Sequence, residues 1–376
     1  MSTCPECGTE RDESLGFCTA CGRSNSNNAE VPPFMQSKRS VDNSKNKTFS
    51  VVAVVILVAS VFAGIVLIGG SPDFRGTQND DGTYVLNNTS TGIYNKTDWY
   101  EISAGGEKYL GDGNSIEWTP PAEGTYIIEM RVSTISGLKH YVDKVVRSIE
   151  KNWNYGTDSY TVKIIAVGDD YLRYRDDSVN RWPGESADTS LVQNYLRTDT
   201  ENNLFQSIAS QMVAQFPADA TAEYKVNAVA SFVQQFRYIT EVDEYGRTID
   251  YWKFPLETIY DMGGDCEDLA ILCMALTKHV FAKEGKSVSV ALALYWGSAD
   301  GKIGGHAMAA IALDSEPVFT PTSASAVKQN TGLGYKVGDK TYYVCETTAK
   351  EWKVGEIHKD YGSYDMTTKM GKLIPV

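Results

Sequence analysis

Basic residues are scarce in this chain of 376 residues, where 35 Lys and Arg stand against 48 Asp and Glu for a formal net charge of −13. Residues 1–47 carry six basic and six acidic residues, and residues 48–71 carry none of either kind. Residues 72–376 therefore hold the whole negative charge. An acidic body argues against nucleic acid and anionic lipid as partners, because both reward a basic surface. The length suits two or three domains.

Charge is absent throughout Phe49–Ile68, whose sequence is FSVVAVVILVASVFAGIVLI. About 20 apolar residues at a rise of 1.5 Å per residue cross a bilayer core of roughly 30 Å. The segment is too long for the hydrophobic region of a cleaved signal peptide, and it starts too far from Met1. We therefore predict a single transmembrane helix over residues 49–68.

The residues that flank this segment predict its orientation. Those before it are mainly basic: Lys38, Arg39, Lys45 and Lys47, opposed only by Asp42. Those after it are mainly acidic: Asp73, Asp80 and Asp81, with Arg75. Since positive residues stay in the cytoplasm, we expect a cytoplasmic N-terminus and an extracellular C-terminal part.

The seven cysteines fall into two groups. Four lie near the N-terminus in the pattern C-x2-C-x10-C-x2-C: Cys4, Cys7, Cys18 and Cys21. Four thiolates at this spacing predict a tetrahedral, structural zinc site in residues 1–23. Two disulfides are the alternative, but a cytoplasmic segment is kept reduced. The site resembles the short zinc ribbons of many prokaryotic membrane proteins. Its cytoplasmic partner is not identified by the sequence.

The regions on either side of the predicted span differ in character. Residues 24–48 are polar and rich in Ser and Asn, which predicts a flexible linker. Residues 75–175 contain short runs that alternate apolar and polar residues and are separated by turn signals, as in NSIEWTPPAEGTYIIEMRVS. Such runs are typical of a β-sandwich. We predict an extracellular, Ig-like β-domain that holds the next domain away from the membrane.

The C-terminal region, residues 176–376, mixes helical and strand patterns. Apolar residues at steps of three and four predict helices in ENNLFQSIASQMVAQF and ATAEYKVNAVASFVQQFRYI. A further helix is predicted to begin at Cys266 with Asp265 as its N-cap. Strand-like runs follow, in the order VSVALALYW, HAMAAIAL and TYYVCETT.

Cys266 is a candidate nucleophile because of its place at a helix start. The N-terminus of a helix stabilises a thiolate, and its N–H groups can hold an oxyanion during acyl transfer. Such a cysteine needs a histidine base and a group that orients the histidine. His306 and Glu346 follow in that order, and the other histidines are His140, His279 and His358.

The segments GGDCEDLAILCMAL, GGHAMAAIAL and YYVCETT together resemble the transglutaminase-like superfamily. With FVQQFRYI and YWKFPLETIYDMGGDCED upstream, the chain is similar to bacterial transglutaminase-like cysteine proteases and their archaeal membrane relatives. The resemblance covers roughly residues 200–350. It implies an α+β, papain-like core and a triad of Cys266, His306 and Glu346. The family usually has Asp where this chain has Glu346, and often an aromatic residue where it has Ala307.

Three carboxylates surround Cys266 in sequence: Asp265, Glu267 and Asp268. Acids in a first helical turn interact favourably with the helix dipole, and this is the simplest explanation for them. Clustered carboxylate oxygens outside a cell also suit calcium, and the resemblance permits calcium dependence. The same acids raise the thiol pKa, so a bound cation would help to activate Cys266.

Several residues near the predicted site have two interpretations. Cys273 and Cys345 are either buried small residues, which we favour, or a disulfide. Tyr251 and Trp252 either pack in the core or line the substrate cleft and donate to the oxyanion.

The sequence thus predicts a multidomain protein of a prokaryotic, archaeal-type cell membrane. It consists of a zinc ribbon, one transmembrane helix, a β-sandwich-like domain and a transglutaminase-like domain. The predicted activity is acyl transfer on extracellular peptides or proteins, mainly proteolysis, with transamidation sharing the thioester step. One alternative is a noncatalytic module that binds a surface peptide and signals to the zinc ribbon. Another is a cell-envelope protein whose active site has lapsed.

Overall fold

The computed structural model describes residues 2–3, 10–11, 70–177, 181, 189–196, 203–246, 251–296, 305–321, 323–328, 335–358 and 371–376. Two short strands, β1 (Ser2–Thr3) and β2 (Glu10–Arg11), pair antiparallel. The four predicted zinc ligands, the linker and the predicted span all lie outside the described residues. Within the described ranges, no helix has the length and apolar character needed to cross a membrane.

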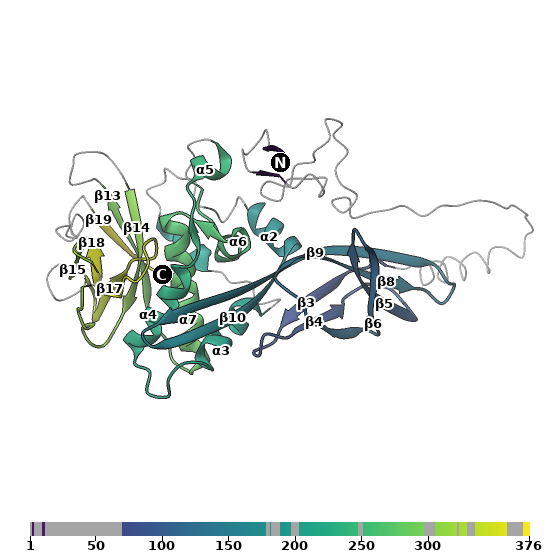
Figure 1. The fold of residues 1–376 in the computed structure, drawn as a ribbon, viewed down its shortest axis with the longest axis horizontal. Coiled ribbons are helices and arrows are strands. Elements are labelled where there is room, and N and C mark those ends of the chain that lie inside the picture. The colour runs from purple at the N-terminus through teal and green to yellow at the C-terminus, as the bar shows by residue number, and fades with distance from the viewer. Residues whose placement is uncertain are drawn as a thin grey trace, which may run out of the picture. The chain divides into compact units, whose positions relative to one another are not determined.

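The chain is multidomain and divides into two compact units (Figure 1). The first unit holds the chain up to Thr77, together with Tyr84–Thr119 and Thr125–Val146. The second unit holds Gln78–Thr83, Pro120–Gly124 and Arg147–Val376. The division between Val146 and Arg147 falls inside one long strand, β9 (Lys139–Tyr155), which contributes residues to both units.

The first unit is built from strands. A three-stranded sheet has the order β3-β4-β7. A five-stranded sheet has the order β10-β9-β8-β5-β6, and its strand β10 belongs to the second unit. The strands are β3 (Phe74–Gln78), β4 (Tyr84–Asn88), β5 (Lys96–Ser103), β6 (Gly106–Asp112), β7 (Ser115–Trp118) and β8 (Gly124–Ser133). The two sheets contact through Phe74 and Trp99, whose rings pack edge to face at 5.2 Å. The predicted β-rich character of this region is confirmed.

The second unit begins with the rest of β9 and with β10 (Asp158–Val167). Its helices follow: α2 (Gly168–Arg175), the 3₁₀ helix η3 (Thr189–Leu196), α3 (Leu204–Val213), α4 (Ala222–Val233), α5 (Glu241–Tyr245), α6 (Pro255–Asp261) and α7 (Cys266–Lys283). Two further short strands, β11 (Arg237–Tyr238) and β12 (Gly263–Gly264), lie on either side of α5 and α6 in sequence. The helices predicted at α3, α4 and α7 are confirmed.

A five-stranded sheet completes the second unit, with the order β16-β17-β14-β13-β19. Its strands are β13 (Val290–Trp296), β14 (Gly305–Ala312), β16 (Tyr335–Val337), β17 (Lys340–Cys345) and β19 (Gly371–Pro375). A small pair, β15 (Ala326–Lys328) and β18 (Glu356–His358), forms a separate two-stranded sheet. The three strands predicted from sequence are β13, β14 and β17.

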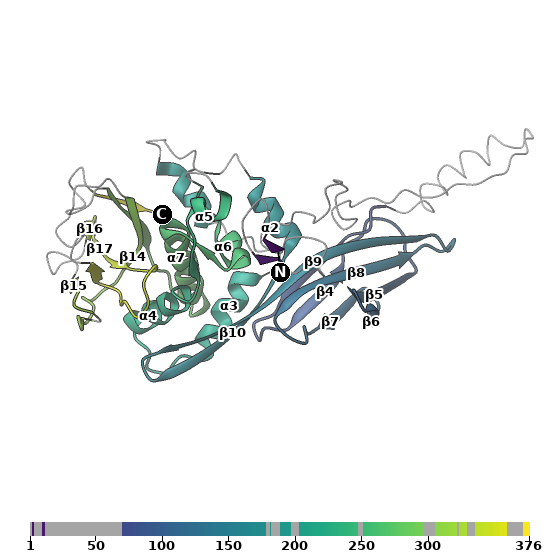
Figure 2. The same ribbon diagram turned by 45° about the horizontal axis from the view of Figure 1, so that its top comes forward.

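Helix α7 is central to the second unit. In Figures 1 and 2 it lies with the sheet on one side and with α3 and β10 on the other. Its first two-thirds are almost wholly buried, including Leu269, Leu272 and Leu276. Alternate residues of β14, such as Ala307 and Ala309, pack in the same core cluster. Burial on all sides fixes the N-terminal end of α7 against the start of β14.

Candidate active site

The turn before α7 is shaped by short-range sterics and backbone hydrogen bonds. Helix α6 ends at Met262, which has a left-handed backbone with φ of 59°. Gly263 and Gly264 then pair in parallel with Arg237 and Tyr238. A Cβ on Gly263 would lie 2.6 Å from the carbonyl oxygen of Arg237, and a Cβ on Gly264 would lie 2.5 Å from Asp268. Only glycine fits at these two positions without a shift of the backbone or of Asp268.

Helix α7 begins at Cys266 with Asp265 at the N-cap, as the sequence predicts. Asp268 is buried and accepts two backbone N–H groups, from Lys253 at 2.6 Å and from Asp265 at 3.3 Å. The bond from Asp265 is the reciprocal half of a capping box. Asp268 therefore holds the turn and the helix start together, and it is separate from the other two acids of the motif.

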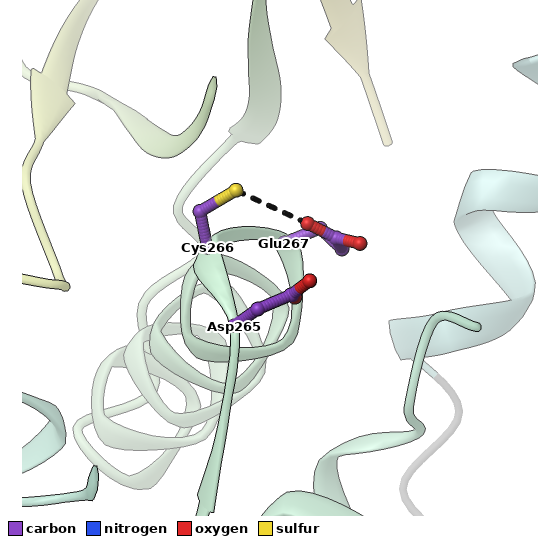
Figure 3. A group of neighbouring side chains, drawn as sticks. All are labelled: Asp265, Cys266 and Glu267. Atoms are coloured by element: carbon purple, nitrogen blue, oxygen red, sulfur yellow. Dashed lines mark hydrogen bonds between the residues drawn. The ribbon is translucent and has the colours of Figure 1, made fainter. Parts of the chain in front are cut away.

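The side chain of Cys266 is buried, with 8% exposed. Its thiol donates to Glu267 Oε2 at 3.1 Å, and Figure 3 shows the Asp265 carboxylate beside this pair. The backbone N–H of Ala307 also donates a hydrogen bond to the sulfur of Cys266. This bond places Cys266 against the start of β14. Burial, followed by Glu267 and Asp265, raises the pKa of the Cys266 thiol above its ordinary value.

His306 and Glu346 are brought together by neighbouring strands. β14 and β17 pair antiparallel from Ala309 opposite Cys345 onward, so the two residues lie near the same end of the pair. His306 Nε2 lies 2.7 Å from Glu346 Oε2, within hydrogen-bond distance. His306 immediately precedes Ala307, whose backbone N–H bonds to the sulfur of Cys266.

Glu346 is held in place by more than the histidine. Its Oε1 accepts the backbone N–H of Thr348 at 2.8 Å and the Thr348 hydroxyl at 2.7 Å. Burial opposes the charged form, but His306 and Thr348 together hold the pKa of Glu346 below its ordinary value. The longer Glu side chain thus reaches the imidazole while its other oxygen is fixed by the following turn.

Glu346→Gln should lower the free energy of unfolding at pH 7 by about 1.5–3 kcal/mol, the worth of a hydrogen bond to a charged group. A carboxyl whose folded-state pKa is depressed contributes stability above its unfolded pKa, near 4.3, and that contribution disappears as pH falls through the lower folded value. Chemical unfolding at pH 7, 5 and 3 should show the difference between wild type and variant shrinking with pH. The exposed Asp314→Asn serves as control; a gap independent of pH would contradict the assigned contact.

The other histidines lie elsewhere. His140 belongs to β9 in the first unit and packs near Tyr94, with ring centroids 6.0 Å apart. His279 lies far along α7 beside Phe205, at 5.9 Å. His358 stacks with Trp352 at 6.1 Å. Of the four histidines, His306 is the one that precedes Ala307, the residue whose backbone N–H bonds to the sulfur of Cys266.

Two carboxylates lie beside the thiol, and a third carboxylate contacts one of them. One ligand atom from each of Asp265, Cys266 and Glu267 lies within 4.8 Å of the others. Glu241 of α5 also bonds to Asp265, a contact that sequence spacing does not reveal. Asp265 is 8% exposed, and its Oδ1 has no hydrogen-bond partner. Burial, with Glu267 and Glu241 adding to it, raises the pKa of Asp265, and burial followed by Asp268 raises that of Glu267.

The remaining cysteines and aromatic candidates have clear positions. Cys273 and Cys345 are free and fully buried, as favoured from the sequence, and their thiols contact each other. Trp252 is 5% exposed and packs against Tyr195, with ring centroids 5.7 Å apart. The Tyr251 hydroxyl donates to Glu257 Oε1 at 2.7 Å. Trp252 thus belongs to the core, and the Tyr251 hydroxyl is committed to a structural bond.

No protein-family model matches the sequence, and no curated protein matches it. Among solved structures, the chain is similar to Legionella pneumophila LapG, with 18% identity and a TM-score of 0.27 over 44% of this chain and 76% of LapG. A calcium-bound LapG structure shares 19% identity at a TM-score of 0.25, over 44% of this chain and 78% of that one. An EGTA-treated LapG structure shares 17% identity at a TM-score of 0.25, over 44% of this chain and 79% of that one. With likeness this low, the function has to be argued from the site itself.

Proposed function

We propose that this chain is a cysteine-nucleophile acyl transferase that acts on peptide or amide bonds, chiefly as a peptidase. Two contacts near the N-terminal end of α7 support the proposal. Cys266 begins a buried helix, its sulfur lies against the N–H of Ala307, and the adjacent His306 pairs with Glu346 at 2.7 Å.

Each residue has a distinct role in the proposed reaction. The sulfur of Cys266 attacks the carbonyl carbon, and its proton passes through His306 Nδ1 to the leaving amine as the C–N bond breaks. Glu346 fixes the ring orientation through Nε2. The backbone N–H of Cys266, at the start of α7, stabilises the oxyanion. Water then hydrolyses the thioester and restores the thiol, whereas an amine in place of water would give transamidation.

The carboxylates beside the thiol also fit a divalent cation. Asp265 and Glu267 present oxygens close to Cys266, and the buried Oδ1 of Asp265 has no hydrogen-bond partner. Oxygen donors of this kind are those that calcium prefers. Asp265 and Glu267 would hold the ion, and its charge would offset the carboxylates that raise the thiol pKa.

Reactivity of the thiol tests the proposed activity directly. In the full-length chain with calcium, iodoacetamide should modify Cys266 faster than the buried Cys273, as followed by mass-spectrometric mapping across pH 5 to 10. Cys273 is an internal control in the same helix. A Cys266 that reacts as slowly as Cys273 at every pH would end the enzyme proposal. It would favour the noncatalytic binding module instead.

Calcium should raise the melting temperature of the wild-type chain relative to chelator. A site that binds only the folded state adds about 2.7 kcal/mol of stability at a ligand concentration 100 times Kd. Asp265→Asn and Glu267→Gln should each remove most of this shift, and the exposed Asp314→Asn should keep it. Scanning calorimetry with and without chelator measures it. An equal calcium shift in Glu267→Gln would place the ion elsewhere.

The proposed setting of the enzyme is the outer face of a prokaryotic, archaeal-type cell membrane. The uncharged segment 49–68 and the basic residues before it support an anchor with its N-terminus in the cytoplasm. The C-x2-C pairs support a cytoplasmic zinc ribbon. Protease protection of an N-terminal tag in sealed membrane vesicles would test this orientation.

A further inference from the structure

Tyr238 lies beside the candidate nucleophile although 28 positions separate it from Cys266 in sequence. It ends the two-residue strand β11, in register with Gly264 of β12. The bonds on either side are Arg237 N–H to Met262 O at 3.1 Å and Ile239 N–H to Gly264 O at 3.0 Å. The backbone of Tyr238 is therefore held opposite Gly264, which lies two residues before Cys266 in sequence.

The side chain of Tyr238 combines exposure with proximity to the site. It is 52% exposed, unlike the buried aromatic residues of the surrounding core. Four groups of the candidate site affect the Tyr238 hydroxyl electrostatically: Cys266, Asp265, Glu267 and Glu241. Burial, followed by these negative groups, raises the pKa of Tyr238, so the phenol stays protonated and remains a hydrogen-bond donor.

Acyl transfer at Cys266 needs such a donor. The carbonyl oxygen of the substrate gains a full negative charge when sulfur adds, and the backbone N–H of Cys266 supplies one hydrogen bond. The two candidates from sequence serve the fold instead, since Trp252 is buried against Tyr195 and the Tyr251 hydroxyl donates to Glu257.

We propose that Tyr238 donates the second hydrogen bond of the oxyanion site, through its hydroxyl to the carbonyl oxygen of the bound substrate. The assignment rests on the proposed acyl-transfer function and adds a residue that contacts the reacting atoms. Its geometric basis is the register of β11 with β12, which holds Tyr238 opposite Gly264, and the exposure of the Tyr238 ring.

Two reactions of the same thiol separate this role from any other. With p-nitrophenyl acetate, sulfur adds to the carbonyl carbon, the C=O electron pair moves to oxygen, and collapse breaks the ester C–O bond and releases p-nitrophenolate. With iodoacetamide, sulfur displaces iodide at a saturated carbon, and no oxyanion forms. An oxyanion donor is needed in the first reaction only.

Tyr238→Phe in the full-length chain should slow the burst of p-nitrophenolate by about 100-fold, as for loss of one oxyanion donor. The rate of Cys266 alkylation by iodoacetamide should stay within about twofold of wild type, because the thiol keeps its surroundings. Tyr141→Phe, matched at 52% exposure but in the first unit, should leave both rates unchanged. Tyr251→Phe should also leave the burst unchanged.

Three results would overturn the assignment. A normal burst in Tyr238→Phe would show that no oxyanion bond is lost. Equal slowing of both reactions would show that Tyr238 acts on the thiol or on the fold. A slow burst in Tyr251→Phe, with a normal burst in Tyr238→Phe, would assign the oxyanion bond to Tyr251, one of the two candidates from the sequence. If wild-type Cys266 is alkylated no faster than Cys273, the proposed function itself has failed, and that result is distinct from the other three.

Discussion

His306→Gln should slow the acylation of Cys266 by p-nitrophenyl acetate by about 10²- to 10⁴-fold, the usual worth of a positioned general base. Glutamine can still donate to the buried carboxylate of Glu346, so the strand pair keeps its polar contact. An amide takes up no proton near neutral pH, so the thiol loses its base. Stopped-flow release of p-nitrophenolate, with calcium present, measures the rate.

His358→Gln is the matched control for this experiment. His358 is partly buried in β18 and stacks on Trp352. Its loss should leave the acylation rate unchanged within about twofold. If the two variants acylate at equal rates, His306 is not the base.

Lys253→Met should destabilise the second unit by about 3–5 kcal/mol, the cost of leaving buried charges without their partner. The Lys253 side chain is 2% exposed, and its Nζ lies 2.6 Å from Glu244 Oε2 and 3.0 Å from Asp261 Oδ2. It also donates to the carbonyl of Gly263 at 3.2 Å, in the turn before Cys266. Burial opposes the ammonium form, but Asp261, Asp268 and Glu244 outweigh it and raise the pKa of Lys253.

Hydrogen exchange of the α7 amides under native conditions would report this loss locally. Lys286→Met is the control, because Lys286 is 62% exposed and its nearest acid is Glu284 at 3.3 Å. Exposed pairs of that kind are worth about 0–1 kcal/mol. Equal exchange in the two variants would contradict a clamping role for Lys253.

The sequence predicts those parts of the site that depend on local signals. The start of α7 follows from a capping acid before an apolar run, and β13, β14 and β17 follow from short, largely apolar runs. The structure brings His306 and Glu346 together at one end of the β14–β17 pair. The zinc ribbon and the membrane span stay predictions, since they lie outside the described residues.

The remaining site residues depend on a long-range pairing that has no local signature. Backbone bonds of Arg237 and Ile239 hold Tyr238 opposite Gly264, and Glu241 follows three residues later. A strand of two residues carries no periodic pattern. Proximity in sequence makes Tyr251 and Trp252 candidates for the site as well as for the core. The fold uses Tyr251 for a bond to Glu257 and buries Trp252.

The close approach of Gly263 and Gly264 to their neighbours has a consequence for how this segment can vary over evolution. A side chain at Gly264 would collide with Asp268, and one at Gly263 would collide with the backbone of Arg237. A single substitution at Gly263 or Gly264 therefore damages the turn unless a compensating change is already present. Selection for an intact turn would therefore act on Gly264 and Asp268 jointly, because a change at one is tolerated only with a change at the other.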